Sequence, residues 1–570
     1  MATTTIEART GDTASRYAQL EERIMDRDQV AASEVFYDLV RDGRPLEEML
    51  RETVRVHAPY THMPYHQRID DGVVRFVNND HCLLSARASL RMPAMLPEQL
   101  RFLPMAQTMW YVPTGLDAWN QLLGKAPGHY GKRVYDAEKY PIPPPPTQHW
   151  QDVEPIGSEG TLDERLNHWL TLVQYGHVED SYGVFRGIVA DPANRPKAMA
   201  QLMFAGLIDV QDRMLLNRSY TTGHKSFRAR ATIELTQAVG WDNAHDVIYA
   251  GVPDMAVGPR WYSAYEMACE VALRHLEDVP PMSSLDPTRV TTLDVELFAN
   301  TEDLSSAERT ILMRSLLEET EPAYIETIIA LLKGGRSPKA ILDTIQIAAA
   351  EVVLRCGIGP SFSMPQHGYE YTNMLAWFYE NFEHKHKTKL LFVAGSFINQ
   401  TASWVRNSPG NGKPIFKAPA AAEGMSRDQL LSQLDAAMTR LEPDEAACWV
   451  QAYLDAGHDR QPLITTLTFG AAKQGNDPHN QEIGLCMLED YGRTSSPDRD
   501  RLLLAAAKHT AGHSKYGDSL ESYNRFAQAF DLPPALGAPG DRDPMQAVFD
   551  EIEQVPLADE ESVPKGLLTN

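Results

Sequence analysis

The sequence lacks the features that mark membrane and secreted proteins. Its 570 residues contain no apolar run of the roughly 18 residues that a membrane-spanning helix needs. The first residues, MATTTIEARTGDTASRYAQLEERIMDRDQ, have no apolar core, so a secretory signal is not expected. These absences predict a cytoplasmic protein with no membrane partner.

Cysteine is scarce, and the five cysteines form no C-x-x-C pair. This argues against a disulfide framework and against an iron–sulfur site, and it predicts reduced, mostly buried thiols. No G-x-G-x-x-G follows a strand pattern, so a Rossmann-type nicotinamide or flavin site is not expected.

Positive charge is also in deficit, with 53 Lys and Arg against 77 Asp and Glu and a net charge of −24. A nucleic-acid partner needs a basic surface, so the charge balance argues against one. Hydrophobic residues make up 43% of the chain, which is ordinary for a globular protein. The length exceeds that of one ordinary domain and predicts several domains or one repetitive array.

What the sequence does contain is helical periodicity. Apolar residues recur every three or four positions in AMAQLMFAGLIDVQDRMLL (198–216), KAILDTIQIAAAEVVLRC (339–356) and SRDQLLSQLDAAMTRL (426–441). Patterns of period two are rare, and DGVVRFVNN (71–79) is the best strand candidate. The predicted class is all-α.

Proline- and glycine-rich segments divide this helical pattern, above all YPIPPPPTQHW and NSPGNGKPIFKAPAAAEG. The predicted organisation is an N-terminal helical unit (1–139), a proline-rich linker (140–150), central helical repeats (151–406), a second linker (407–424), a C-terminal helical repeat (425–532) and an acidic tail (533–570).

Four segments share one layout, which indicates an internal repeat. In each, a proline follows a polar turn and opens a helix, a linker follows, and a histidine begins a second helix. The prolines are Pro45, Pro196, Pro338 and Pro462, and the histidines are His81, His224, His367 and His479. The segments HCLLSARASL (81–90) and HKSFRARATI (224–233) also match internally, and the first three histidines are 143 residues apart.

Repeated helical hairpins bury their apolar faces on one another, in a closed ring or in a superhelical array. Equivalent positions of a closed ring point toward one axis, so the four histidines would converge. Neutral imidazole binds zinc, iron, copper or nickel, and helix bundles build metal sites from separate helices. The alternative is that each histidine is a structural group at the start of its helix.

Four neutral histidines leave the charge of a divalent cation uncompensated, so an anionic oxygen is expected nearby. The candidates are Glu370, Glu234, Asp477, Glu482 or a modified lysine. His66 lies fifteen residues before His81 and could reach the same centre across a hairpin, or serve at the surface. Tyr369 follows His367 and could line a pocket as a catalytic residue, although a helix aromatic is more often plain core.

Two segments resemble the questin-oxidase-like family and related helical proteins found fused to Rieske-type domains. They are HGYEYTNMLAWFYENFEHKHKTKLLFVAGSFINQTASW (367–404) and GHKSFRARATIELTQAVGWDNAHDVI (223–248). The resemblance is patchy and covers about 65–90, 198–250, 338–404 and 463–515.

The resemblance implies an oxygenase of aromatic polyketides, acting by Baeyer–Villiger-type oxygen insertion or by ring cleavage. The ring-cleaving type uses non-haem iron held by four histidines and a carboxylated lysine. Carried over, the ligands are His81, His224, His367 and His479, with His66 as a substitute or neighbour, and Lys473 as the lysine. The sequence has no Rieske C-x-H and C-x-x-H pair, so electrons would come from the substrate or an external donor.

The sequence therefore predicts a metal-dependent oxidoreductase, a non-haem iron mono- or dioxygenase. It would use Fe(II) and O2 on an aromatic or polyketide-like organic substrate. The first alternative is a hydrolase or lyase with zinc on the same ligands. The second is a non-enzymatic helical scaffold in which the histidines are structural relics. Metal content separates the scaffold from both enzymes.

Overall fold

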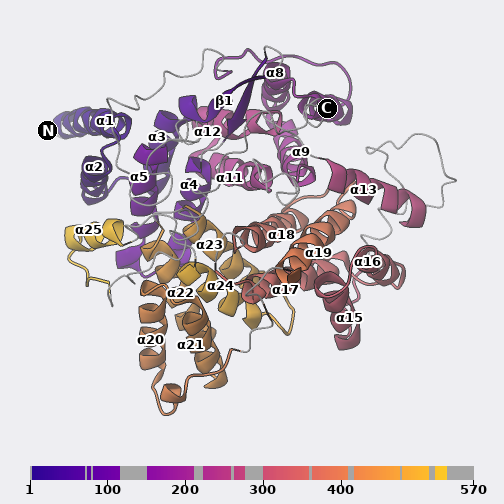
Figure 1. The fold of residues 1–570 in the computed structure, drawn as a ribbon. Helices are drawn as coiled ribbons and strands as arrows, with labels where there is room; N and C mark the ends of the chain where they lie inside the picture. Colours follow the sequence, from indigo (N-terminus) through magenta and orange to yellow (C-terminus); the bar gives the residue numbers. More distant parts are fainter. Residues whose placement is uncertain are drawn as a thin grey trace.

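The structure is a computed structural model that describes residues 3–70, 73–78, 81–115, 150–210, 223–257, 262–276, 300–358, 362–407, 412, 416–475, 478–512 and 520–535. Helices account for most of the described residues, which confirms the predicted all-α class (Figure 1). No helix within these ranges is both long and apolar enough to cross a membrane. Residues 140–149 of the first predicted linker, 408–411 and 413–415 of the second, and 536–570 of the tail lie outside the described residues.

One small antiparallel hairpin interrupts the helices. Strand β2 (Val73–Asn78) confirms the predicted strand, and it pairs with β1 (His62–Asp70) from His62 opposite Asn78 to Asp70 opposite Val73. Strand β1 is not expected from the sequence, because HMPYHQRID shows no alternation of apolar and polar residues.

Four helices lie at the centre of the molecule and form a closed cycle of contacts (Figure 1). They are α4 (Cys82–Arg91), α11 (His224–Val239), α18 (Ser363–Asn381) and α23 (Pro478–Arg493). Helix α4 contacts α11, α11 contacts α18, α18 contacts α23, and α23 contacts α4 again. These inner helices are the ones that the four histidines were predicted to begin.

Each inner helix packs between the helix before it and the helix after it. The preceding helices are α3 (Leu46–His57), α9 (Arg195–Ile208), α17 (Pro338–Arg355) and α22 (Arg460–Lys473). The following helices are α5 (Leu103–Gly115), α12 (His245–Gly251), α19 (Lys389–Asn407) and α24 (Asp500–Gly512). The four prolines lie at or within the starts of the preceding helices, as predicted, because proline has no N–H to lose in a first turn.

A second set of contacts joins the helices that precede the inner helices to the helices that follow them. Helix α12 contacts α3, α19 contacts α9, α24 contacts α17, and α5 contacts α22. In the first three contacts, the helix that follows one inner helix packs on the helix that precedes the inner helix before it in the sequence. The fourth contact, between α5 and α22, connects the first and last inner helices in the same way. The inner cycle is thereby enclosed by a second layer of helices.

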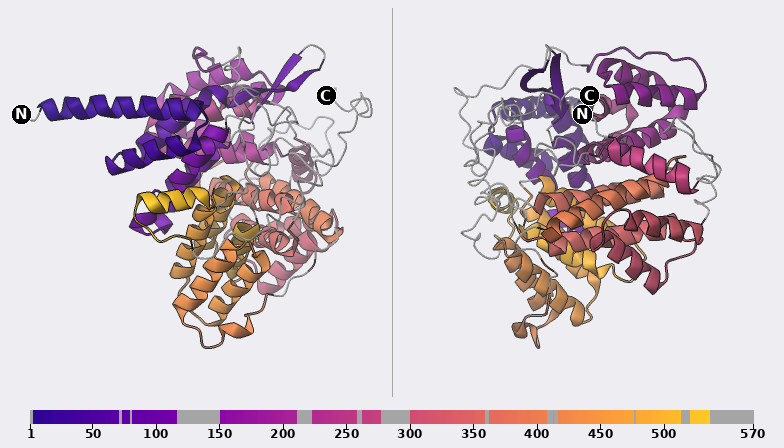
Figure 2. Two further views of the ribbon diagram at one scale, coloured as in Figure 1. Left: turned by 60° about the vertical axis from the view of Figure 1, so that its left-hand side comes forward. Right: turned by 45° about the vertical axis from the view of Figure 1, so that its right-hand side comes forward.

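The remaining helices pack outside this double layer. They are α1 (Thr3–Met25), α2 (Gln29–Arg41), α7 (Leu162–Tyr175), α8 (Val178–Val189), α13 (Ser263–Val271), α15 (Ser306–Leu317), α16 (Ala323–Lys333), α20 (Arg427–Thr439), α21 (Pro443–Asp455) and α25 (Glu521–Ala529). Helix α1 projects from the body, and the α20–α21 pair extends from another end of it (Figure 2). Short 3-10 turns connect several of these helices.

Two glycines allow helices to approach α11 closely. A Cβ on Gly206 of α9 would lie 2.7 Å from the carbonyl oxygen of Lys225, and a Cβ on Gly251 of α12 would lie 1.7 Å from Oγ1 of Thr232. Only glycine fits both positions without movement of the neighbour. These contacts fix α11, and with it His224, against its two flanking helices.

Candidate metal centre

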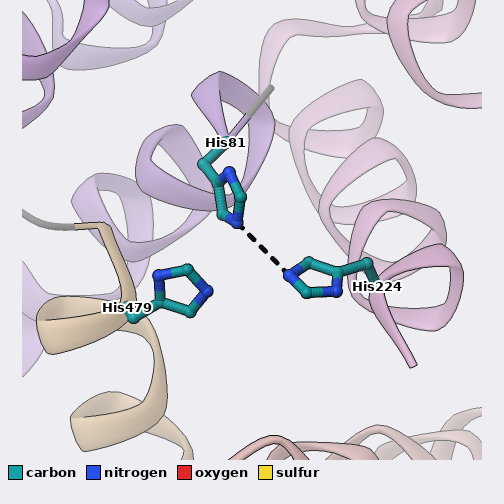
Figure 3. A group of neighbouring side chains, drawn as sticks. All are labelled: His81, His224 and His479. Atoms are coloured by element: carbon teal, nitrogen blue, oxygen red, sulfur yellow. Dashed lines mark hydrogen bonds between the residues drawn. The ribbon is translucent and has the colours of Figure 1, made fainter. Parts of the chain in front are cut away.

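Three of the predicted histidines meet at the ends of three inner helices. His81 is the N-cap of α4, His224 is the first residue of α11, and His479 lies in the first turn of α23. One ring nitrogen from each lies within 4.8 Å of those of the other two (Figure 3). The Nε2 atoms of His81 and His224 are 3.3 Å apart. Side chains from widely separated parts of the chain thus point into one space.

His367, in the first turns of α18, borders the same group. Its ring centroid lies 4.8 Å from that of His224 and 5.1 Å from that of His479. Its Nδ1 donates a hydrogen bond of 2.7 Å to the carbonyl oxygen of Ser363, which puts the lone pair of the neutral ring on Nε2. Metal-binding histidines are commonly oriented by such a bond from the other ring nitrogen.

A further histidine, His509 of α24, supports the group through two hydrogen bonds. The amide of Gln366 donates to Nδ1 of His509 at 2.7 Å, so Nε2 carries the proton and donates to the carbonyl oxygen of His479 at 3.0 Å. These hydrogen bonds connect α18, α24 and α23 next to His367 and His479. No sequence pattern indicates this arrangement, because the three residues meet only in the folded chain.

The surroundings of His224 favour a neutral imidazole. Burial, followed by the neighbouring His367 and His81, lowers the pKa of His224 well below its usual value. A neutral imidazole offers a lone pair, and a cluster of neutral rings can therefore accept a cation but resists protonation.

Two of the predicted anionic residues lie one helical turn beyond the histidines. Glu370 follows His367 by three residues on α18, and Glu482 follows His479 by three residues on α23. Both side chains are fully buried, and their carboxyl groups interact with each other. Burial, and then the charge of Glu482, raises the pKa of Glu370 well above its usual value. Burial also raises the pKa of Glu482, to about 7.

Deeper still, the inner helices share a buried ionic network. Arg87 contacts Glu234 at 2.6 Å and Glu489 at 2.8 Å, while Arg230 contacts Glu489 at 2.9 Å and Glu234 at 3.4 Å. Arg230 also donates to Oδ1 of Asn373 at 2.6 Å. Arg87, Arg230 and Asn373 each lie six residues after a histidine of the group. The repeated Ala-Arg-Ala of the first two segments was the sequence signal for this network, and Glu234 belongs to it.

The structure gives the other predicted residues different surroundings. The amine of Lys473 donates to Oδ1 of Asp435 at 2.5 Å and to Oγ1 of Thr439 at 2.7 Å, so it is an ion-paired ammonium between α22 and α20. The hydroxyl of Tyr369 donates to Oδ2 of Asp490 at 2.8 Å inside the core. Asp477 and the side chain of His66 lie outside the described residues.

Comparison with known proteins assigns this protein to no family. No protein-family model matches the chain, and no curated protein or solved structure is significantly similar to it.

Proposed function

We propose that this protein is a metal-dependent oxidoreductase whose metal ion is held by His81, His224 and His479, with His367 as a fourth ligand. The observation that carries the proposal is the meeting of these imidazoles from four separate helices. Metal ligands must meet in one space, whereas histidines that only begin helices need not. Similar nitrogen ligands on separate bundle helices are a common way to build such centres.

The residues around the metal would bind, orient and shield it. Neutral imidazoles supply lone pairs, the Ser363 carbonyl sets the tautomer of His367, and His509 holds the backbone at His479. Between the surrounding inner helices His479 is buried, and His81 and His224 are partly buried. A bound iron would supply redox chemistry with O2, and this choice of metal rests on the resemblance to questin-oxidase-like proteins.

The substrate class also rests on that resemblance. We propose an aromatic or polyketide-like compound, with electrons from the compound itself or from an external donor. Zinc on the same imidazoles, with hydrolase or lyase chemistry, is the second candidate, because nitrogen donors suit both metals.

We further propose that the chain consists of four repeats, each with one preceding, one histidine-bearing and one following helix. The support is the recurrence of the same set of contacts in all four units. In such a ring, repetition of one histidine position is sufficient to generate a four-nitrogen site on the axis.

The decisive experiment is metal analysis of untagged protein beside His224→Ala and His479→Ala variants. The control is His168→Ala, because His168 is an exposed residue of α7. We expect near-stoichiometric iron in the parent and control, and loss of it in both site variants. Cobalt(II) titration would give visible absorption in the parent only if several ligands bind one ion.

Metal identity then decides the reaction class. Iron would be followed by measurement of O2 consumption with aromatic polyketide-type compounds, and zinc by hydrolase assays. Absence of bound iron, zinc and cobalt from correctly folded parent protein would refute the proposed centre and favour the scaffold alternative.

A further inference from the structure

We propose that Glu370 and Glu482 form the built-in counter-charge of the metal centre, and that binding of a divalent cation to the histidines expels one proton from this carboxyl pair. The inference rests on the proposed function, and it assigns the anionic partner of the centre to two glutamates instead of a modified lysine.

The positions of the two glutamates place them next to the histidines. His367 and Glu370 share α18, His479 and Glu482 share α23, and these two helices contact each other. Side chains three residues apart lie on one helix face, with about 5–6 Å between their Cβ atoms. The pair therefore lies next to the histidines without belonging to the group of three that converge within 4.8 Å. Its effect on a bound ion would be exerted through charge.

The charged residues around the inner helices also support a counter-charge role for the two glutamates. Four arginines pair with four acids, namely Arg87, Arg91, Arg230 and Arg493 with Glu234, Glu380, Glu489 and Asp490. Lys225 pairs with Asp209 at 2.7 Å, and Arg228 pairs with Asp254 at 3.2 Å. Within the described chain, no salt bridge reaches Glu370 or Glu482, so two buried carboxyl groups remain without a cation of their own.

The contact between the two carboxyl groups gives further support. Among the described residues, no hydrogen-bond donor from outside the pair reaches any of their four oxygens, and both side chains are fully buried. Two buried carboxylates in contact cannot both be ionised at low cost, so one proton or one cation must accompany them. The raised pKa values of both groups fit a pair that keeps one proton near neutral pH.

Among the charged and titratable groups near the carboxyl pair, the pair itself is the one that can release a proton when metal binds. Arg87 of α4 and Arg228 and Arg230 of α11 face it, and each is already bound to another acid. The thiol of Cys486 on α23 is close as well, and burial raises its pKa well above the usual value, so it stays neutral. When a divalent cation binds four neutral imidazoles, its two charges are balanced by two carboxylates, and the shared proton leaves to solvent.

The test is calorimetric titration of metal-free protein with cobalt(II) or zinc at pH 7 in two buffers of different ionisation enthalpy. The comparison gives the number of protons released per metal bound. We expect the parent to release about one more proton than either Glu370→Gln or Glu482→Gln. We also expect both variants to bind metal more weakly, by about 10- to 100-fold, as is typical when groups just outside the ligands are removed.

The matched control is Thr372→Val, which removes a buried hydrogen bond to a backbone carbonyl on the same helix without touching a titratable group. It should keep the proton count of the parent. Equal affinity and equal proton release in the parent and both Gln variants would overturn the inference while leaving the metal centre intact. Metal binding by the parent without any proton release would overturn it even if the variants do not fold. Failure of the folded parent to bind metal would instead refute the proposed function.

Discussion

The Nε2 atoms of His81 and His224 lie 3.3 Å apart, although 143 residues separate the two histidines in the chain. At this distance both imidazoles cannot be charged at low cost, and a proton or a metal ion between them is favoured. The ring of inner helices determines the contact, because α4 and α11 are neighbours in it and both histidines lie at helix starts.

The buried ionic network should dominate the stability of the inner helices. In Glu489→Gln, Arg87 and Arg230 retain only Glu234 between them, so we expect the free energy of unfolding to fall by about 3–5 kcal/mol. Urea denaturation measures it, with exposed Glu423→Gln as control. A loss no larger than that of the control would show that the network does not hold the helices together.

The same glutamate should make the protein sensitive to acid. Burial alone would raise the pKa of Glu489, but Arg230 and Arg87 hold it far below its usual value. Its contribution is therefore complete above the pKa of an unfolded glutamate and is lost as pH falls below that value. Stability measured between pH 7 and pH 3 should decline less in Glu489→Gln than in the parent, and parallel curves would contradict this.

Lys473 should act through its ion pair with Asp435. We expect Lys473→Met to lower the free energy of unfolding by about 3 kcal/mol, because it leaves a buried carboxylate alone. Asp435→Asn together with Lys473→Met should be milder than the sum of the single changes. Metal content should be unchanged in all three. Loss of metal in Lys473→Met alone would instead favour the carboxylated-lysine ligand that the resemblance implies.

His384 should give a distinct pH dependence. Its Nε2 lies 3.0 Å from Oε1 of Gln201, its ring stacks on Phe204 at 4.1 Å, and burial together with Lys385 and Lys387 lowers its pKa to about 3. The unfolded chain takes up this proton near pH 6.5, so stability is lost as pH falls from there toward 3. At pH 5 the loss is up to about 2 kcal/mol. In His384→Gln this part of the slope should disappear in thermal or urea unfolding.

Gly206 should be intolerant of a side chain. The added methyl group of Gly206→Ala would press on the backbone of Lys225, which follows His224, so we expect a loss of about 1–3 kcal/mol and weaker metal binding. Gly157→Ala is the control, because nothing lies within 4 Å of its added carbon. Unfolding and metal titration measure both effects. Equal results for the two glycines would show that α9 does not position α11.

Part of the fold and of the site followed from local sequence patterns. Apolar residues at spacings of three and four predicted the helices, and the prolines marked the starts of α3, α9, α17 and α22. The recurrence of a histidine at helix starts predicted the convergence of four histidines, of which His81, His224 and His479 meet within 4.8 Å while His367 borders them. These features could be predicted because helical periodicity and repetition are properties of short segments.

Other features depended on contacts between distant segments. The sequence could not tell that Glu370 meets Glu482, or that Lys473 is bound to Asp435, because each pair joins two helices. It also could not separate these acids from Glu234, which binds arginines. By itself, the sequence determined which segments form helices and that His81, His224 and His479 lie at helix starts. Only the tertiary structure decided which charges are neutralised by a partner, because pairing depends on how the helices pack around the ring.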